Sequence, residues 1–458
     1  MGNKSIKILL IHPEVSRTKY NFAGIIENEC LDLEYLSAHL KNLGHIVEIF
    51  DTQVEEISAV KKIKLFDPQV VYVCGRVKQE NFMLEYCAQA KKHNREILTI
   101  IGGIHSQLCR ERLLKDYVDY VAATFDVFTV SDIIHHHFGI KETDLSTASG
   151  VCTKIGDKWQ INPTIPFDIK KLPLPDRTYF YDHPNNYGYL DMKHAACVRT
   201  AYCCPYCCKF CCRNRMNAGK YTSRDIADVV DEIENIKAEN IYIVDDDFLV
   251  NKKRLITFIE LIKERNIRKK YICFGRADFI AKNEDVMTQL KEIGFTYVLV
   301  GLEAIDDSHL LDYNKKSNLA NNLKAIEICQ KLNINIMAMF ILDLSYTPKD
   351  FRNLYRWIKK HNLRHVAVSI FLPEMGMEPY EEYKDRLITH NPSHWDYLHV
   401  VAKPDNMSVK RYYLHYYILL IRLFFKAKRE GVYDFVDYKS YILSFIRNIF
   451  VKRKNDDE

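Results

Sequence analysis

Short apolar runs alternate with longer amphipathic stretches over the first 125 residues of the chain. The runs are bounded by glycine, proline or polar residues, which predicts buried strands. The stretches between them predict helices, one of which ends at Gly44, a suitable C-cap. Strands that alternate with helices indicate βαβ units, a parallel sheet and a doubly wound, Rossmann-like domain. The predicted strands are 7–13, 45–50, 70–75, 97–103 and 117–123.

Glycine and polar residues follow three of these predicted strands directly. In a doubly wound sheet, ligands bind beyond the carboxyl ends of the strands. Paired glycines after a buried strand also let the backbone approach a large flat ligand closely. We therefore expect the following residues to surround a ligand cleft: Pro13, Gly75, Arg76, Gly102, Gly103, Ile104 and His105.

A second series of strands and helices follows a short connecting region. A hairpin is predicted at 150–165 with its turn at Gly156–Asp157, and the sequence LPLPDRTYF follows as a linker with extended backbone. Six repeats of strand and helix then fit an incomplete α/β barrel better than a flat sheet. From about residue 395 the chain is rich in aromatic residues and predicted to be largely helical. The strands of this series are predicted near 194–200, 240–245, 271–275, 296–301, 334–342 and 365–371.

These patterns predict an α/β protein with four consecutive parts. A Rossmann-like doubly wound domain is expected over 1–145, and the hairpin and linker over 146–182. A partial (β/α)6 TIM-like barrel is expected over 183–390, and a helical C-terminal region over 391–458.

Composition narrows the class of protein. Of the 458 residues, 47% are hydrophobic and 27% are charged, which is ordinary for a soluble globular protein. The net charge of +5 is small and the basic residues are spread out, so no nucleic-acid partner is expected. No secretory signal opens the chain, which favours the cytoplasm. The segment YYILLIRLFF is short and contains Arg422, which predicts a buried or interfacial helix and no transmembrane segment.

Six of the fourteen cysteines lie between positions 203 and 212. A disulfide framework is typical of small secreted domains, so metal binding is the better interpretation. Cys204 with Cys207, and Cys208 with Cys211, have the C-x-x-C spacing of a zinc site. A zinc ribbon needs a loop between its two pairs, whereas these pairs abut, so zinc is the weaker alternative.

One frame of this segment gives the spacing C-x-x-x-C-x-x-C, on Cys204, Cys208 and Cys211. Three thiolates on one tight loop can hold three irons of a cubane and leave the fourth iron open. A cofactor with an amine and a carboxylate can chelate that open iron. The remaining cysteines of the segment receive no role: Cys203, Cys207 and Cys212.

The loop resembles that of the radical S-adenosylmethionine (SAM) superfamily, whose frequent form is C-P-Y-x-C-x-F-C. The resemblance implies a [4Fe-4S] cluster on the three cysteines and SAM beside it. The later segments IYIVDDDFLVN, FGRAD and VLVGLEAID resemble strand motifs of the family in the same order. The residues implied to contact SAM are Tyr206, Phe210, Asp245, Asp246, Arg276 and Glu303. For Glu303, pairing with Arg276 inside the barrel is the alternative. Asp343 and Ser345 stand where relatives often carry glycine and proline, which weakens the transfer of detail at the fifth strand.

One subgroup of that superfamily begins with a Rossmann-like cobalamin-binding domain, followed by a hairpin and an L-P-x-P-D linker. This chain is similar to it in that order over roughly residues 5–385. The D-x-H-x-x-G motif that supplies a cobalt ligand in many cobalamin proteins is missing, and His12 lacks that context. A domain without cofactor therefore remains the alternative. The implied cobalamin contacts are Pro13, Gly75, Arg76, Gly102, Gly103 and His105.

The resemblance implies an oxygen-sensitive enzyme that cleaves SAM to a 5′-deoxyadenosyl radical. Its leading function is cobalamin-dependent methylation of an unactivated carbon. The alternatives are radical oxidative cyclisation, hydroxylation or rearrangement without methyl transfer, and a non-catalytic cobalamin or iron–sulfur sensor. The expected partners are a small-molecule or peptide substrate and an external electron donor such as flavodoxin or ferredoxin. The aromatic segments after residue 395 either cap the barrel over an aromatic or lipid-like substrate or form a helical core face.

Overall fold

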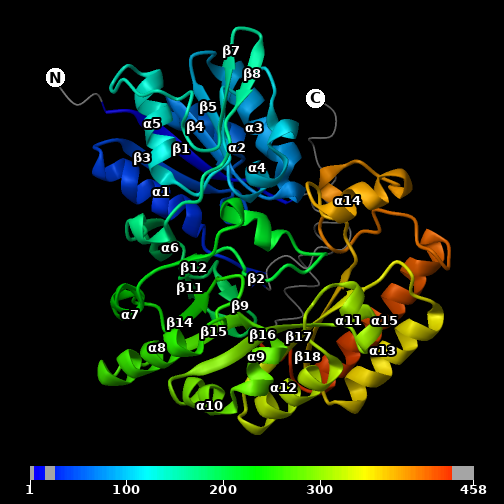
Figure 1. The fold of residues 1–458 in the computed structure, drawn as a ribbon. Coiled ribbons are helices and arrows are strands. Elements are labelled where there is room, and N and C mark those ends of the chain that lie inside the picture. The colour runs from blue at the N-terminus through cyan, green and yellow to red at the C-terminus, as the bar shows by residue number, and fades with distance from the viewer. Residues whose placement is uncertain (1–4, 16–25, 436–458) are drawn as a thin grey trace.

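The computed structural model describes residues 5–15 and 26–435, which form two parallel sheets with covering helices (Figure 1). The first sheet has seven strands in the order β3-β1-β4-β5-β6-β7-β8. Its first five strands are parallel, and the last two are the predicted hairpin, paired antiparallel to β6. The bounds are β1 Lys7–His12, β3 Ile46–Asp51, β4 Val70–Cys74, β5 Leu98–Gly102, β6 Tyr120–Ala122, β7 Val151–Ile155 and β8 Lys158–Ile161.

Successive side chains of a strand point to opposite sides of this sheet, and helices bury both sides. Ile8 and Leu10 of β1 pack into one apolar cluster with α1 and α5, whereas Leu9 and Ile11 pack into another with α2 and α3. The predicted doubly wound domain is thereby confirmed. Its helices are α1 Leu31–Asn42, α2 Ala59–Phe66, α3 Glu80–His93, α4 Ile104–Cys109 and α5 Val127–His137.

The second sheet is the predicted partial barrel of six parallel strands, in the order β11-β14-β15-β16-β17-β18. Its side chains alternate in the same way: Cys273 joins the outer cluster under the helices, and Ile272 joins the inner cluster. Tyr189 and Met192 belong to that inner cluster and help to fill it. The bounds are β11 Ala195–Val198, β14 Asn240–Ile243, β15 Lys270–Gly275, β16 Phe295–Glu303, β17 Asn335–Leu342 and β18 His365–Ile370.

Helices cover the outside of the barrel, and a C-terminal region follows them (Figure 1). The barrel helices are α7 Ile226–Asn235, α8 Lys252–Glu264, α9 Ala277–Lys282, α10 Glu284–Glu292, α11 Asp307–Asp312, α12 Leu319–Lys331 and α13 Pro348–Lys360. The C-terminal region contains the long α15 Val409–Arg429, which confirms a helical element there, whereas the short α14 Glu378–Tyr383 lies within the range predicted for the barrel. The predicted helical content after 435 lies outside the described residues. Among the described residues, no helix has both the length and the apolar character needed to cross a bilayer.

Short elements connect these parts. The predicted extended linker ends in the short helix α6 Thr178–Asp182, because no proline follows Pro175 until position 184. The short strands are β2 Ile26–Glu27, β9 Gly188–Tyr189, β10 Met192–Lys193, β12 Ala201–Tyr202 and β13 Thr222–Ser223. The 3₁₀ helices are Val77–Gln79, Arg110–Leu113, Ile169–Lys171, Cys212–Gly219, Lys384–Arg386 and Pro392–His394. The domain boundaries at residues 145, 182 and 390 stay predictions.

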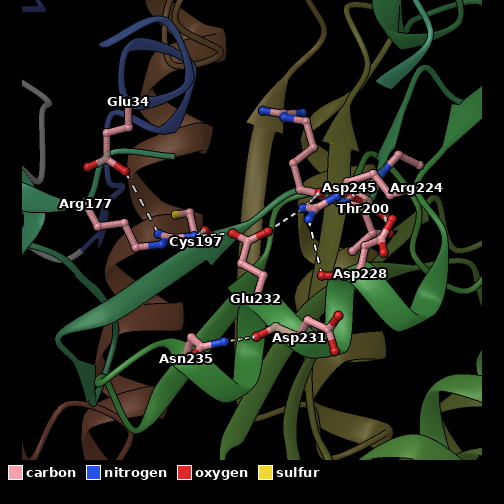
Figure 2. A network of polar contacts seen from close by, with 12 residues as sticks. Glu34, Arg177, Cys197, Thr200, Arg224, Asp228, Asp231, Glu232, Asn235 and Asp245 are labelled. Carbon is pink, nitrogen blue, oxygen red and sulfur yellow. Dashed lines mark hydrogen bonds and ion pairs between the residues drawn. The ribbon is translucent and has the colours of Figure 1, made fainter. Parts of the chain in front are cut away.

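A buried network of charges joins the first domain to the barrel (Figure 2). Arg177, which precedes α6, bonds to Glu29, to Glu232 of α7 at 2.6 Å and to the Cys197 carbonyl of β11 at 2.8 Å. Burial disfavours the charged guanidinium, but the charges of Glu29, Glu232 and Glu34 outweigh it and raise the pKa of Arg177. A buried cation needs such partners because its desolvation is costly. Arg177 therefore fixes three segments that are distant in sequence.

Replacing Arg177 by alanine should lower the free energy of unfolding by about 3–5 kcal/mol, because it leaves buried carboxylates without a counter-charge. Urea denaturation followed by circular dichroism measures this change. Arg265→Ala is the matched control, because Arg265 pairs with Asp231 and Glu234 on the exposed surface. The control should lose less than about 1 kcal/mol. Equal losses in the two variants would contradict the role assigned to Arg177.

Candidate cofactor site

The cysteine loop leaves the barrel directly after β11 and the short strand β12. Asp245, which follows β14, is buried and accepts hydrogen bonds from the backbone nitrogens of Thr200 at 2.6 Å and Ala201 at 3.0 Å. Its second oxygen accepts from the Thr200 hydroxyl. Both oxygens of Asp245 thus fasten the base of the loop. A contact of Asp245 with SAM stays a prediction, and its carboxylate already has these partners.

The loop continues with an unusual backbone turn at Cys203, whose φ of 68° lies in the left-handed region. Cys208 is buried, Cys204 and Cys211 are half-buried, and Cys207 is exposed. Burial raises the pKa of the Cys204 thiol to about 12 and also raises that of Cys208. Such thiols lose their protons when a metal centre supplies positive charge. Cys207 is exposed and so differs from the three cysteines of the motif, which are buried or half-buried.

The sulfur spacing bears on the choice between zinc and a cluster. A single zinc ion lies about 2.3 Å from each sulfur, which brings its ligand atoms within roughly 4 Å of one another. Among the described residues, three metal-ligating atoms within 4.8 Å of one another occur at His12, Cys30 and Asp51, and not in the cysteine loop. The three motif sulfurs are therefore not held at the spacing of a single bound zinc ion. At His12, the Asp51 carboxylate already receives hydrogen bonds from the imidazole and from Cys30.

Two cations from later segments of the barrel face the loop, one after β15 and one between α11 and α12. Arg276, after β15, stacks on the Tyr206 ring with 3.8 Å between guanidinium and ring centroid, and its Nη1 lies 4.0 Å from Cys208 Sγ. Lys315 is buried and lies 5.7 Å from the centroid of the Phe210 ring. The structure thus brings Tyr206, Phe210, Cys208 and Arg276 together, as the sequence predicts. Lys315 carried no motif signal and was missed.

Each of these cations also has a carboxylate partner. Arg276 bonds to Asp278 at 2.8 Å, and Lys315 bonds to Glu303 at 2.6 Å. The alternative pairing of Glu303 with Arg276 is therefore wrong, because Lys315 occupies the carboxylate. Glu303 adopts a φ of 62° at a bulge of β16. This bulge re-aims a side chain that regular alternation would direct elsewhere.

Three consecutive aspartates follow β14, and they differ in their surroundings. Asp246 forms an ion pair with Arg213 at 3.3 Å. Asp247 is buried, and one of its oxygens accepts from Leu249 N at 3.0 Å while the other has no hydrogen-bond partner. Burial raises the pKa of Asp247 to about 7 against the opposing charge of Arg276. An orphaned buried carboxylate oxygen beside the loop fits an ammonium group such as the SAM amine. The sequence alone did not single out Asp247, because the three aspartates are consecutive in one motif and only their burial distinguishes them.

The glycines of the first domain allow two of its loops to approach closely. Gly103 has a φ of 90°, and a Cβ there would lie 2.9 Å from Gly75 N. A Cβ on Gly102 would lie 2.0 Å from Tyr72 Oη. A small cavity of about 30 Å³ opens beside them, lined by Asp32, Tyr35, Leu36, Tyr72, Cys74, Gly103, Thr124, Phe125, Asp126, Val127, Val130 and Tyr202. This cradle at the carboxyl ends of β4, β5 and β6 fits the place where such sheets hold a ligand.

The other residues of the first domain that are predicted to contact cobalamin differ in their burial and in their partners. His105 is buried and its Nε2 lies 2.6 Å from Glu80 Oε2, which gives it a structural partner within the domain. Pro13 is also buried, and its carbonyl accepts from the Gln79 side chain. Arg76, by contrast, is exposed. Contacts of Pro13, Arg76 and His105 with cobalamin stay predictions.

The first domain contacts the segment that follows the cysteine loop, because Gln107 of α4 accepts a hydrogen bond from Asn217 N at 3.0 Å. Tyr397, in the C-terminal region, exposes 44% of its surface. The charge of Arg213 and burial lower the pKa of Arg76, which places these two guanidinium groups near each other. Glu374 is buried and accepts from Tyr397 Oη at 3.4 Å. Groups from the first domain, the cysteine loop and the C-terminal region thus lie near one another.

Comparisons with known proteins agree with this arrangement. Residues 29–127 match the B12 binding domain, and residues 198–358 match the radical SAM superfamily. The chain is therefore a cobalamin-dependent radical SAM enzyme, of the subgroup with a cobalamin-binding domain. The radical SAM domain implies SAM and an iron–sulfur cluster as cofactors, and the B12 binding domain supports cobalamin.

Individual relatives share this organisation. The chain is 24% identical over 420 residues to the hopanoid C-3 methylase of Methylococcus capsulatus. The aligned region covers 89% of this chain and 78% of the methylase. It is 24% identical over 418 residues to the anaerobic magnesium-protoporphyrin IX monomethyl ester cyclase of Rubrivivax gelatinosus, covering 88% of this chain and 74% of the cyclase.

Among solved structures, the fold is similar to the cobalamin-dependent SAM radical enzyme OxsB, with a TM-score of 0.65 and 17% sequence identity. The match covers 84% of this chain but only 55% of OxsB, so the chain spans about half of that protein's length. At this identity the likeness concerns the fold.

Alanine in place of Cys204, Cys208 or Cys211 should remove most of the iron–sulfur cluster, because each thiolate would hold a different iron. The measurement is iron and sulfide content, with electron paramagnetic resonance of the reduced protein after anaerobic reconstitution. Cys207→Ala is the matched control, since this exposed cysteine lies in the same loop. The control should keep a full cluster. A cluster that survives replacement of all three motif cysteines would disprove this ligand set.

Proposed function

We propose that this enzyme methylates an unactivated carbon of its substrate, with the cluster on Cys204, Cys208 and Cys211 as a [4Fe-4S] centre. The observation that carries the proposal is the contact between the two domains, in which Gln107 of α4 accepts a hydrogen bond at 3.0 Å from the backbone nitrogen of Asn217, just after the cysteine loop. The contact adjoins both the strand ends of the B12 binding domain and the cysteine loop. A substrate held beside it would be within reach of both cofactors, as methyl transfer requires. The similarity to a hopanoid C-3 methylase supports the same reaction class.

The chemistry comes from the cofactors and the protein provides their positions. When bound, the cluster and SAM supply a 5′-deoxyadenosyl radical, and cobalamin supplies a methyl group. An external donor such as flavodoxin or ferredoxin provides the electron, and the reducing cytoplasm suits an oxygen-sensitive centre. The protein's own part is to bind, to orient and to exclude water.

We assign the SAM contacts to groups that surround the cysteine loop. Asp247 accepts a hydrogen bond from the SAM amine with its orphaned oxygen. Arg276, held flat against Tyr206, offers its guanidinium to the SAM carboxylate. Lys315 and Glu303 form a neutral pair beside them. Together these groups place one negative and one positive charge opposite the two charged ends of the amino acid.

Asp247→Asn should weaken SAM binding by roughly 10- to 100-fold, because a charge-assisted hydrogen bond contributes about 1.5–3 kcal/mol. The fold should be retained, since asparagine keeps an oxygen for Leu249 N. Isothermal titration calorimetry of SAM into the anaerobically reconstituted protein measures the dissociation constant. Asp231→Asn, on the exposed surface, should leave it unchanged. An unchanged dissociation constant in Asp247→Asn would show that Asp247 does not bind the SAM amine.

Methyl transfer has a product signature that distinguishes it from the alternatives. Reconstituted protein with reductant, cobalamin and SAM carrying a deuterated methyl group should form both 5′-deoxyadenosine and S-adenosylhomocysteine. A substrate from a small-molecule extract should gain one labelled methyl group. Omission of cobalamin should abolish S-adenosylhomocysteine and the label. Liquid chromatography with mass spectrometry measures all three products.

The second candidate is an oxidative cyclisation, hydroxylation or rearrangement without methyl transfer. The similarity to a magnesium-protoporphyrin cyclase, at the same identity as the methylase, favours it over other chemistries. It predicts 5′-deoxyadenosine without S-adenosylhomocysteine, and a product that loses hydrogen or gains oxygen. Absence of SAM cleavage under every condition would leave only the non-catalytic sensor.

A further inference from the structure

Helix α15 lies against the outside of the barrel. Tyr412 near its start donates to the Leu342 carbonyl at the carboxyl end of β17, at 2.8 Å. Lys426 near its end donates to the Leu363 carbonyl, just before β18, at 2.5 Å. The helix therefore runs along the barrel from the carboxyl to the amino edge of these strands. Its inward face, which includes Tyr416 and Leu419, is buried.

The opposite face of α15 carries a continuous apolar stripe. Leu414, Ile418, Ile421 and Phe425 are between 39% and 63% exposed. Their spacing of four, three and four residues places them within about 60° of the helix circumference. Single exposed apolar residues are common on proteins, but a contiguous row of this kind marks an interaction site.

Basic residues flank this stripe on both sides. Helix α15 contains no aspartate or glutamate. At about 100° per residue, Arg411, Arg422 and Arg429 lie within about 40° of one edge of the stripe, and Lys410 and Lys428 lie beside the other. All five side chains are exposed. An apolar stripe between two cationic rows is the pattern of a helix that lies in a membrane interface.

We propose that this face of α15 docks the enzyme on an anionic lipid surface. The apolar stripe enters the headgroup layer, and the long basic side chains extend along it to reach the lipid phosphates. Docking is a peripheral attachment, in accord with the lack of a membrane-spanning helix among the described residues. The proposal concerns location and is independent of which radical reaction the enzyme performs.

The charge of this face disfavours two other occupants. A second copy docked face to face would oppose identical cationic rows without any acidic partner on α15. The chain after Phe435 is the other candidate, but positions 436–458 carry five basic and four acidic residues, so this segment has no net negative charge to match the basic rows. An anionic surface is the complementary partner.

The test is co-sedimentation of the full-length reconstituted enzyme with lipid vesicles under anaerobic conditions. We expect binding to vesicles that contain phosphatidylglycerol, weak binding to pure phosphatidylcholine, and release at high salt. The variant Ile418→Ser/Ile421→Ser/Phe425→Ser should lower the partition coefficient at least about tenfold. Arg411→Glu/Arg422→Glu should remove the preference for the anionic lipid.

Matched controls keep the experiment independent of folding and of catalysis. Leu311→Ser and Leu65→Ser replace exposed apolar residues on other elements and should not change vesicle binding. Circular dichroism and SAM cleavage should be unchanged in the α15 variants, because these side chains lie on the outer face, away from the cysteine loop. Failure of methyl transfer would therefore not affect this test.

Three results would overturn the proposal. The first is an enzyme that stays in the supernatant with every vesicle. The second is a dimer that the triple variant disperses without any vesicle binding, which assigns the face to a second copy. The third is vesicle binding that appears only after removal of residues 436–458, which assigns the face to that segment.

Discussion

The hydrogen bonds between the Asp245 carboxylate and the backbone of Thr200 and Ala201 fix the point at which the cysteine loop leaves the barrel. A rotation at this base would move all three motif cysteines together. The far side of the loop is held by hydrogen bonds from Asn314 to the Cys207 carbonyl at 2.8 Å and from Lys209 N to the Tyr313 carbonyl at 3.0 Å. The left-handed turn at Cys203 directs the chain immediately before Cys204. The remainder of the site depends on this anchored loop, because Arg276 and Lys315 are placed relative to it.

Charge balance decides what this site can hold. Arg276 and Lys315 face Cys208, and each keeps one carboxylate partner, since an unpaired buried ion is costly. Beside the cysteine loop, the buried Asp247 keeps one carboxylate oxygen without a hydrogen-bond donor. Guanidinium, ammonium and orphaned carboxylate thus meet beside three sulfurs, which matches an anionic centre with an amino acid next to it. The cost of an unpaired buried ion also explains why Arg177 has two carboxylate partners, which fix the first domain to the barrel.

Distinct surfaces of the molecule then serve distinct tasks. The cysteine loop and the B12 binding domain meet where Gln107 of α4 accepts a hydrogen bond from Asn217 N. Helix α15 lies along the outside of the barrel and contacts β17 and the segment before β18. The ion pairs of Arg177 with Glu29 and Glu232 hold the first domain on the barrel.

The sequence by itself determined both parallel sheets, the hairpin and the cysteine frame, because strand periodicity, glycine turns and ligand spacing are local signals. It also named Tyr206, Phe210 and Arg276, which the fold brings together. Only the tertiary structure decided that Lys315, and not Arg276, pairs with Glu303, and that Asp247 keeps a buried oxygen without a donor. These outcomes depend on a strand bulge and on burial, which arise from packing between segments far apart in the chain.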